Sequence, residues 1–219
     1  MSASDAYRNG GADLLRGLLS PEVAAAMTHM TAIGIAHTGT RWLVQPKSIL
    51  DKPCYEAPSG AWSILMTFLW AMTPKIEDVT GVHLLPTYSY FRTYQQGDVC
   101  RIHSDRSACE HSVSLTLAYA DGISWPLAVA DTPKTEGHRQ QKQRGENDFG
   151  DEAYSEYVMA PGDAVLYRGI DYRHGRLAPN PNRWSAHLFM HWVDRDGPYR
   201  DQLFDGRTMT GAVDFRFPD

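Results

Sequence analysis

His103 and Asp105, together with His174 further along the chain, are the residues whose types and spacing could do chemistry. On a β-strand, side chains two residues apart point to the same face, so His103 and Asp105 could reach one ion. Two imidazoles and one carboxylate can occupy one face of a six-coordinate Fe(II) ion and leave the opposite face open. The three residues therefore predict an iron site, provided that the fold brings His174 beside the first pair.

The segments around these residues have the two-residue period of β-strands. Polar and apolar side chains alternate along residues 88–94 and again along residues 112–119. Further strands are expected at 99–103, 125–130, 156–159, 164–167, 172–177 and 184–193. Many short strands without intervening helices favour an antiparallel sandwich or barrel, and among these the jelly roll commonly carries metal sites.

Helices are expected earlier in the chain, within a helical support region. One is predicted over residues 12–19, and a second begins after the N-cap Ser20 with a proline at its first position. A third covers 61–72, and a short fourth begins at Thr73-Pro74 and ends before Gly81. The predicted fold class is mainly β with N-terminal helices (α+β). The expected single domain comprises a support region (1–82), a β core (83–194) containing a polar loop (131–152), and a C-terminal extension (195–219).

Composition limits the partners and the location of the protein. The net charge of −5 provides no positive field, so no nucleic-acid partner is expected. Residues 1–11 lack the features of a secretory signal and no stretch is long enough to span a bilayer, which predicts a cytoplasmic protein without a membrane partner. Cys54, Cys100 and Cys109 lack paired spacing, which suits reduced and buried thiols. The sequence does not indicate an oligomeric state.

The order of several motifs resembles the Fe(II)/2-oxoglutarate-dependent dioxygenases, in their prolyl-hydroxylase-like branch. The resemblance covers residues 87–194 and includes the run YSYFRTYQQGDVCRIHSDRSACE, the strand SVSLTLAY, the segment APGDAVLYRG, His174 and the triplet RWS. It implies a double-stranded β-helix, the jelly-roll core that cupins also have. It also implies Fe(II) held by His103, Asp105 and His174, with 2-oxoglutarate and O2 as co-substrates.

The resemblance further implies that Arg183 and Ser185 bind 2-oxoglutarate. Residues 178–182 resemble a hairpin turn, which would start the strand of Arg183 close to His174. Arg176, two residues after His174 on the same strand face, is the alternative cation. Tyr94 occupies the position of a family tyrosine that contacts 2-oxoglutarate, and a packed strand tyrosine is an equal interpretation.

The predicted activity is hydroxylation of an unactivated C–H bond in a small molecule or an amino acid. Retention of Asp105 favours hydroxylation over halogenation, because related halogenases replace this carboxylate with a small residue. Three alternatives stay open: a hydroxylase of prolyl or other protein side chains, a non-catalytic cupin-like metal-binding or sensory protein, and, least favoured by the charge, a nucleic-acid demethylase. The polar loop at 131–152 is either a solvated segment or a lid that could clamp a peptide. His187 and His191 are interpreted as polar barrel positions.

Overall fold

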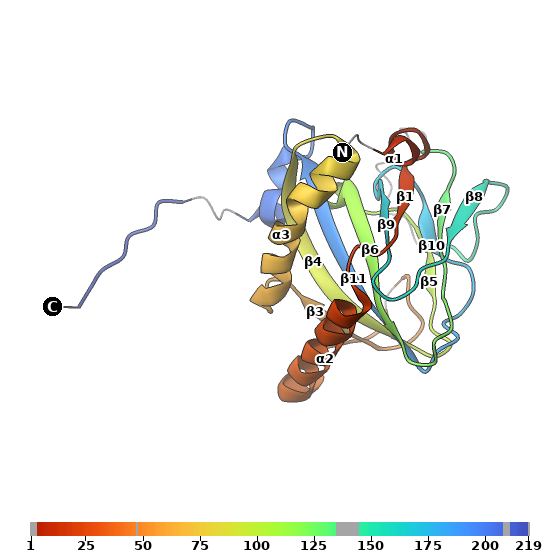
Figure 1. Cartoon of the computed structure of the whole chain (residues 1–219), viewed down its shortest axis with the longest axis horizontal. Helices are drawn as coiled ribbons and strands as arrows, with labels where there is room; N and C mark the ends of the chain where they lie inside the picture. Colours follow the sequence, from red (N-terminus) through yellow and green to blue (C-terminus); the bar gives the residue numbers. More distant parts are fainter. Residues whose placement is uncertain (1–3, 47, 135–144, 208–210, 219) are drawn as a thin grey trace.

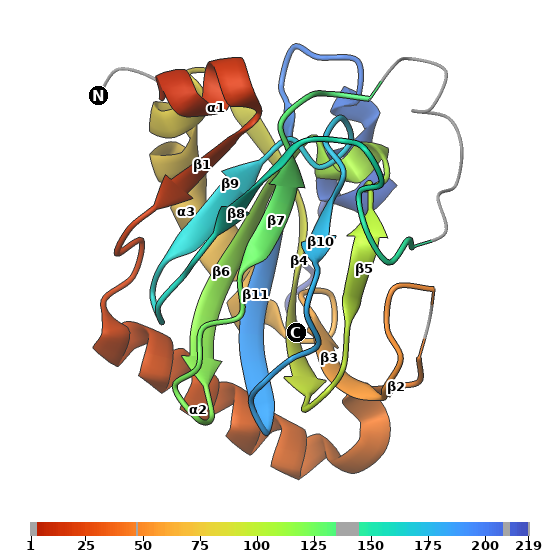
Figure 2. The same cartoon turned by 90° about the vertical axis from the view of Figure 1, so that its right-hand side faces the viewer.

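Two antiparallel β-sheets face each other and form the body of the molecule (Figure 1). The computed structural model describes residues 4–46, 48–134, 145–207 and 211–218. The main sheet has the order β1 (Ala12–Leu15), β9 (Ala164–Tyr167), β6 (His111–Tyr119), β11 (Trp184–Asp194), β4 (Leu84–Gln95), β3 (Cys54–Pro58) and β2 (Leu43–Val44). The second sheet has the order β5 (Cys100–His103), β10 (His174–Arg176), β7 (Leu127–Ala130) and β8 (Tyr154–Tyr157). This arrangement, seen from the second sheet in Figure 2, confirms the predicted mainly β jelly-roll core.

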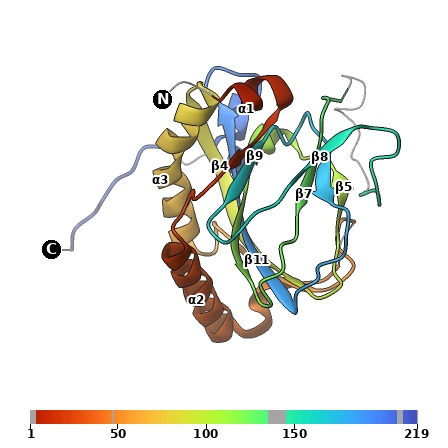
Figure 3. The ribbon, with the colours of Figure 1, turned by 45° about the vertical axis from the view of Figure 1, so that its right-hand side comes forward.

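The helices cover the outer face of the main sheet and leave its inner face to the second sheet (Figure 3). They are α1 (Asp5–Gly10), α2 (Pro21–Thr38) and α3 (Ser63–Thr80), with short 3-10 helices η1 (Gly39–Trp42), η2 (Ser107–Cys109) and η3 (Arg200–Gly206). The start of α2 is confirmed, because the Ser20 side chain accepts a hydrogen bond from the Val23 amide. Leu65, Leu69 and Ile76 of α3 belong to the core cluster that includes Phe91 and Leu188 of the sheet.

Two helix predictions near the N-terminus are wrong. The residues predicted as a helix from position 12 begin instead with β1, because their backbone pairs with β9 in the register Ala12 to Tyr167. The two helices predicted over 61–79 are one, since α3 continues through Pro74. Pro74 lacks the amide hydrogen that would bond to the carbonyl of Trp70, four residues earlier, and the helix continues past this one missing bond. Residues 1–82 thus supply three strands as well as helices.

Side chains alternate in polarity along the central strands of the main sheet. The outer face of this sheet is therefore apolar, and its inner face is polar. In β11, Leu188 and Met190 pack in the core under the helices, whereas His187 and His191 are buried on the opposite side. Such buried polar side chains need hydrogen-bond partners or a ligand. The space between the two sheets is therefore the place where a site can form.

The described part of the polar loop packs against the second sheet. Glu146 pairs with Ile102 in an isolated bridge and forms an ion pair with Arg173, and Phe149 is buried. Residues 135–144 lie outside the described residues, so the choice between lid and solvated loop stays a prediction. Within the described residues, no helix has the length and apolarity that a membrane span requires.

Candidate metal centre and adjoining cavity

His103, Asp105 and His174 come together between the two sheets. The register of the second sheet places His174 of β10 directly opposite His103 of β5, and Asp105 follows two residues after the end of β5. Asp105 Oδ1 lies 3.6 Å from His103 Nε2, and Asp105 Oδ2 lies 3.6 Å from His174 Nε2. The three ligand atoms all lie within 4.8 Å of one another. This is the donor set that suits Fe(II) or a similar divalent ion.

Both histidines are oriented for ligation by hydrogen bonds from their other ring nitrogen. His103 Nδ1 lies 2.7 Å from the Arg101 carbonyl, and His174 Nδ1 lies 3.0 Å from the Tyr172 carbonyl. A carbonyl can only accept, so each Nδ1 carries the proton and each Nε2 presents its lone pair to the centre. Burial lowers the pKa of both imidazoles to about 4, so both are neutral near pH 7. Neutral imidazole is the form that binds metal.

The carboxylate of Asp105 is held by a glycine and a serine. A Cβ at Gly169 would overlap Asp105 Oδ2, so only glycine leaves room for the carboxylate there. Ser112 Oγ lies 3.4 Å from Asp105 Oδ2, 3.2 Å from the Cys109 carbonyl and 2.8 Å from His191 Nδ1. The 2.8 Å contact joins His191 Nδ1 and the Ser112 hydroxyl in a hydrogen bond, which fixes the orientation of the imidazole. His191 Nε2 has no hydrogen-bond partner among the described residues.

Buried histidines make the stability of the metal-free protein depend on pH. Burial lowers the pKa of His103, His111 and His174 to about 4 and that of His191 to about 3, against about 6.5 in unfolded chains. Between pH 6.5 and about 4 the unfolded state binds protons that the folded state does not. Stability is therefore complete above pH 6.5 and is lost as the pH falls, by about 1.4 kcal/mol per pH unit for each histidine. Urea unfolding across this range measures the slope, and a flat profile would contradict the buried neutral state.

A cavity continues from the metal centre into the space between the sheets. The main sheet contributes Tyr90, Arg92, Tyr94, Phe189 and His191 to its lining, and the second sheet contributes Cys100, Leu127 and Arg176. The Arg92 guanidinium is ion-paired with Glu56 and donates to the Tyr94 hydroxyl, 3.2 Å away. Tyr94 lines the cavity and is also packed, so both interpretations of this residue stay predictions.

Arg176 brings a positive charge into this cavity without an acidic partner. Its side chain is 3% exposed, donates to the Trp125 carbonyl and lies 3.4 Å from His187 Nδ1, and no carboxylate of the described residues pairs with it. His187 is fully buried, and its Nε2 has no partner within the described part of the chain. A buried cation without a counter-charge is costly. The arrangement therefore fits an anionic ligand.

The structure does not bring Arg183 to this cavity. Its side chain is 71% exposed and its Nε donates to Asp121 Oδ1, 2.8 Å away. Ser185 is buried but donates to Asn180 Oδ1 at 2.7 Å. The expected hairpin between the strands of His174 and Arg183 is wrong, because β10 and β11 belong to different sheets.

The sequence did not predict His191 as a site residue, although His191 lines the cavity. His191, Cys109 and Asp105 form a second group whose ligand atoms lie within 4.8 Å of one another. This group is less suited to a metal, because His191 Nδ1 contacts Ser112 and the Cys109 thiol contacts the Tyr88 hydroxyl at 3.1 Å. The period of β11 could have placed His191 on the inner face, but only the fold places it beside Asp105. Cys54, Cys100 and Cys109 are buried and form no disulfide bond among the described residues, as predicted.

Neither a protein-family model nor a curated protein matches the sequence. Solved structures match its fold. The non-heme alpha ketoglutarate dependent carbocyclase SnoK from nogalamycin biosynthesis has a TM-score of 0.70 at 12% identity, over 94% of this chain and 92% of the other. The epimerase SnoN in complex with Fe3+, alpha ketoglutarate and nogalamycin RO has a TM-score of 0.64 at 15% identity, over 96% and 90%. A Pseudomonas putida prolyl-4-hydroxylase has a TM-score of 0.58 at 15% identity, over 85% and 95%.

Proposed function

We propose that this chain, which has the fold of the iron- and 2-oxoglutarate-dependent oxygenases, is a hydroxylase of that class. The observation that carries the proposal is the cluster of His103, Asp105 and His174 at the mouth of a cavity that contains an unpaired buried arginine. The donor set fits Fe(II), and the charge of the buried arginine suits an anionic co-substrate. Two related structures are described as alpha ketoglutarate dependent or as complexes with it, which is the compound also called 2-oxoglutarate.

Arg176 is the residue that we propose for the distal carboxylate of 2-oxoglutarate. It follows His174 by two residues, a rise of about 6.6 Å along a strand, which matches the separation between the metal-binding end of 2-oxoglutarate and its far carboxylate. Its planar guanidinium can donate two parallel hydrogen bonds to one carboxylate. His187 Nε2 and the Tyr94 hydroxyl lie on the facing sheet and add polar groups near Arg176. Arg183 and Ser185 stabilise the edge of the main sheet instead. Arg183 does so by its hydrogen bond to Asp121, and Ser185 by its hydrogen bond to Asn180.

The residues of the chain divide the work between binding and orientation. Fe(II), when bound, activates O2 for hydroxylation coupled to the decarboxylation of 2-oxoglutarate to succinate and CO2. His103, Asp105 and His174 hold the ion on one face, and Ser112 fixes the orientation of the Asp105 carboxylate. Arg176 neutralises the charge of the distal carboxylate of 2-oxoglutarate. Tyr90, Phe189 and Leu127 line the cavity and exclude water. His191 Nε2, which has no partner among the described residues, can form a hydrogen bond with a polar group that enters beside Asp105.

The substrate is proposed to be a small molecule or an amino acid, with a peptide as the second candidate. The similarity to a prolyl-4-hydroxylase structure favours keeping that second candidate. Succinate formation should be measured with Fe(II), 2-oxoglutarate and panels of amino acids, peptides and small organic acids. We expect turnover with members of one panel. Retained metal with no succinate from any panel, even without a substrate, would favour the non-catalytic metal-binding alternative.

A further inference from the structure

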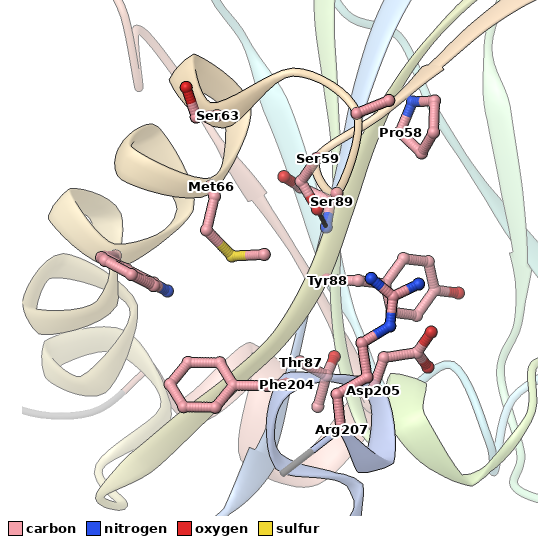
Figure 4. Close-up of a pocket in the computed structure, with 13 residues that line it drawn as sticks. Pro58, Ser59, Ser63, Met66, Thr87, Tyr88, Ser89, Phe204, Asp205 and Arg207 are labelled. Atoms are coloured by element: carbon pink, nitrogen blue, oxygen red, sulfur yellow. Dashed lines mark hydrogen bonds between the residues drawn. The ribbon is translucent and has the colours of Figure 1, made fainter. Parts of the chain in front are cut away.

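A large hollow lies beside the metal centre, on the other side of Tyr88. Its volume is about 570 Å³, within the roughly 300–1,000 Å³ of pockets that bind small molecules. Its walls come from α3, from the loop between β3 and α3, from residues 87–89 of β4 and from the end of η3 (Figure 4). The metal-binding residues do not line it, so it is a separate space.

Tyr88 lines the hollow and packs against residues that line the metal cavity. The Tyr88 ring packs against the His191 ring, with 4.6 Å between their centroids, and stacks on Tyr90. Both of those residues line the metal cavity. Arg106, the residue after Asp105, lies over the Tyr88 ring and forms an ion pair at 2.6 Å with Asp205, which lines the hollow. One aromatic ring therefore separates the hollow from the residues beside Asp105.

The apolar side of the hollow is formed by Trp70, Met66 and Phe204. The Trp70 side chain is 47% exposed, which is unusual for tryptophan, and its ring packs at 6.0 Å from that of Phe204. Figure 4 shows Phe204 reaching toward α3 and Met66 pointing into the space between them. These side chains present a surface for a ring or another flat apolar body.

The backbone at the end of η3 is strained where it forms this wall. Phe204 (φ 50°, ψ 36°) and Asp205 (φ 62°, ψ 38°) both adopt the left-handed conformation, and they are the only residues other than glycine with positive φ among the described residues. This conformation is costly for a residue with a Cβ and tends to occur at ligand sites. Here it directs Phe204 to Trp70 and Asp205 to Arg106 in the same short segment.

Arg207 adds a positive charge that no acid of the described chain neutralises. Asp205 is paired with Arg106, and Arg207 has no carboxylate partner among the described residues. The Arg207 guanidinium lies against Gly60, where a Cβ would come within 2.9 Å of its Nη1. Arg207 lines the hollow together with Tyr88 and Asp205 (Figure 4). The hollow thus combines an apolar surface with one unpaired cation.

We propose that this hollow is a ligand site apart from the metal cavity, and that its ligand is an organic acid with an apolar ring body. The binding of such an acid does not depend on the proposed function. The ring would lie against Trp70 and Phe204, and the carboxylate would accept hydrogen bonds from Arg207.

Binding can be tested with 2-naphthoate and its neutral isostere 2-naphthamide on the metal-free protein, by isothermal titration calorimetry. We expect Arg207→Gln to weaken 2-naphthoate at least about tenfold, since it removes hydrogen bonds to a charged group, and to leave 2-naphthamide unchanged. Trp70→Ala should weaken both compounds. Arg216→Gln is the matched control, because Arg216 is exposed and paired with Asp214 outside the hollow, and it should change neither affinity. No binding of 2-naphthoate, or binding that Arg207→Gln does not weaken, would overturn the site.

Discussion

Asp105→Ala is expected to abolish succinate formation and the binding of Fe(II), while the metal-free protein keeps its fold. Asp105 supplies the one carboxylate of the cluster and lies within 3.6 Å of both imidazoles. Loss of a residue that only orients a ligand typically lowers metal affinity about 10- to 100-fold, so loss of the ligand itself should cost at least the upper value. Metal affinity is measured by titration, and succinate by its rate of formation.

The stability of the Asp105→Ala protein separates a lost ligand from a lost fold. Burial raises the pKa of the Asp105 carboxyl, so the ionised group is held there at a cost in the absence of metal. The metal-free variant should therefore unfold at a temperature no lower than the parent protein, and only the stabilisation by Fe(II) should disappear. Asp121→Ala, which removes a carboxylate from the surface pair with Arg183, is the matched control and should keep both metal binding and turnover. Normal turnover by Asp105→Ala would show that the iron site is wrongly assigned.

Arg176→Met is expected to weaken 2-oxoglutarate about 10- to 100-fold and to leave Fe(II) binding unchanged. The variant removes the one cavity guanidinium that has no acidic partner among the described residues, and hydrogen bonds to charged groups contribute roughly 1.5–3 kcal/mol. The fold should tolerate the change, since the Trp125 carbonyl keeps the Tyr119 hydroxyl at 3.4 Å and removal of an unpaired buried cation is favourable. The affinity for 2-oxoglutarate is measured on the metal-loaded protein without O2.

Two controls decide between the two arginines. 2-Oxovalerate has the carbon chain of 2-oxoglutarate without the distal carboxylate, so it should bind the parent protein and Arg176→Met equally. Arg183→Met is the matched variant, and its side chain is exposed and paired with Asp121, so it should not change the affinity for 2-oxoglutarate. A loss of affinity in Arg183→Met, with none in Arg176→Met, would show that the resemblance placed the anchor correctly and that the proposed role of Arg176 is wrong.

The features of the fold that depend on a local sequence pattern could be predicted from the sequence. The strand at Ala164–Tyr167 was predicted at its observed bounds, and the long strands β4, β6 and β11 followed from alternation that packing enforces. Ser20 and Pro21 marked the start of α2 through their own hydrogen bond and fixed φ. The pairing of His103 with Asp105 was predicted from their two-residue spacing, and the family resemblance implied His174 as the third ligand; the structure brings the three together.

The features that could not be predicted depend on the pairing of strands that are distant in the sequence. The chain crosses from the second sheet to the main sheet between β10 and β11, and this crossing leaves Arg183 at the rim while Arg176 stays inside. No local pattern distinguishes such a crossing from a hairpin. Likewise, β1 is a strand only because β9 lies beside it, and His191 reaches Ser112 only through the register of β11 with β6. In each of these places, contacts with a segment distant in the sequence determined the structure, and the local sequence preference did not.

Anaerobic addition of Fe(II) and then 2-oxoglutarate to the purified protein tests the central claim most directly. The proposed site predicts a weak visible charge-transfer band that appears only when both are present, is missing in Asp105→Ala, and requires a higher concentration of 2-oxoglutarate in Arg176→Met. A folded protein that binds Fe(II) but develops no band at saturating 2-oxoglutarate would contradict the assignment of this cluster and cavity to an iron- and 2-oxoglutarate-dependent oxygenase.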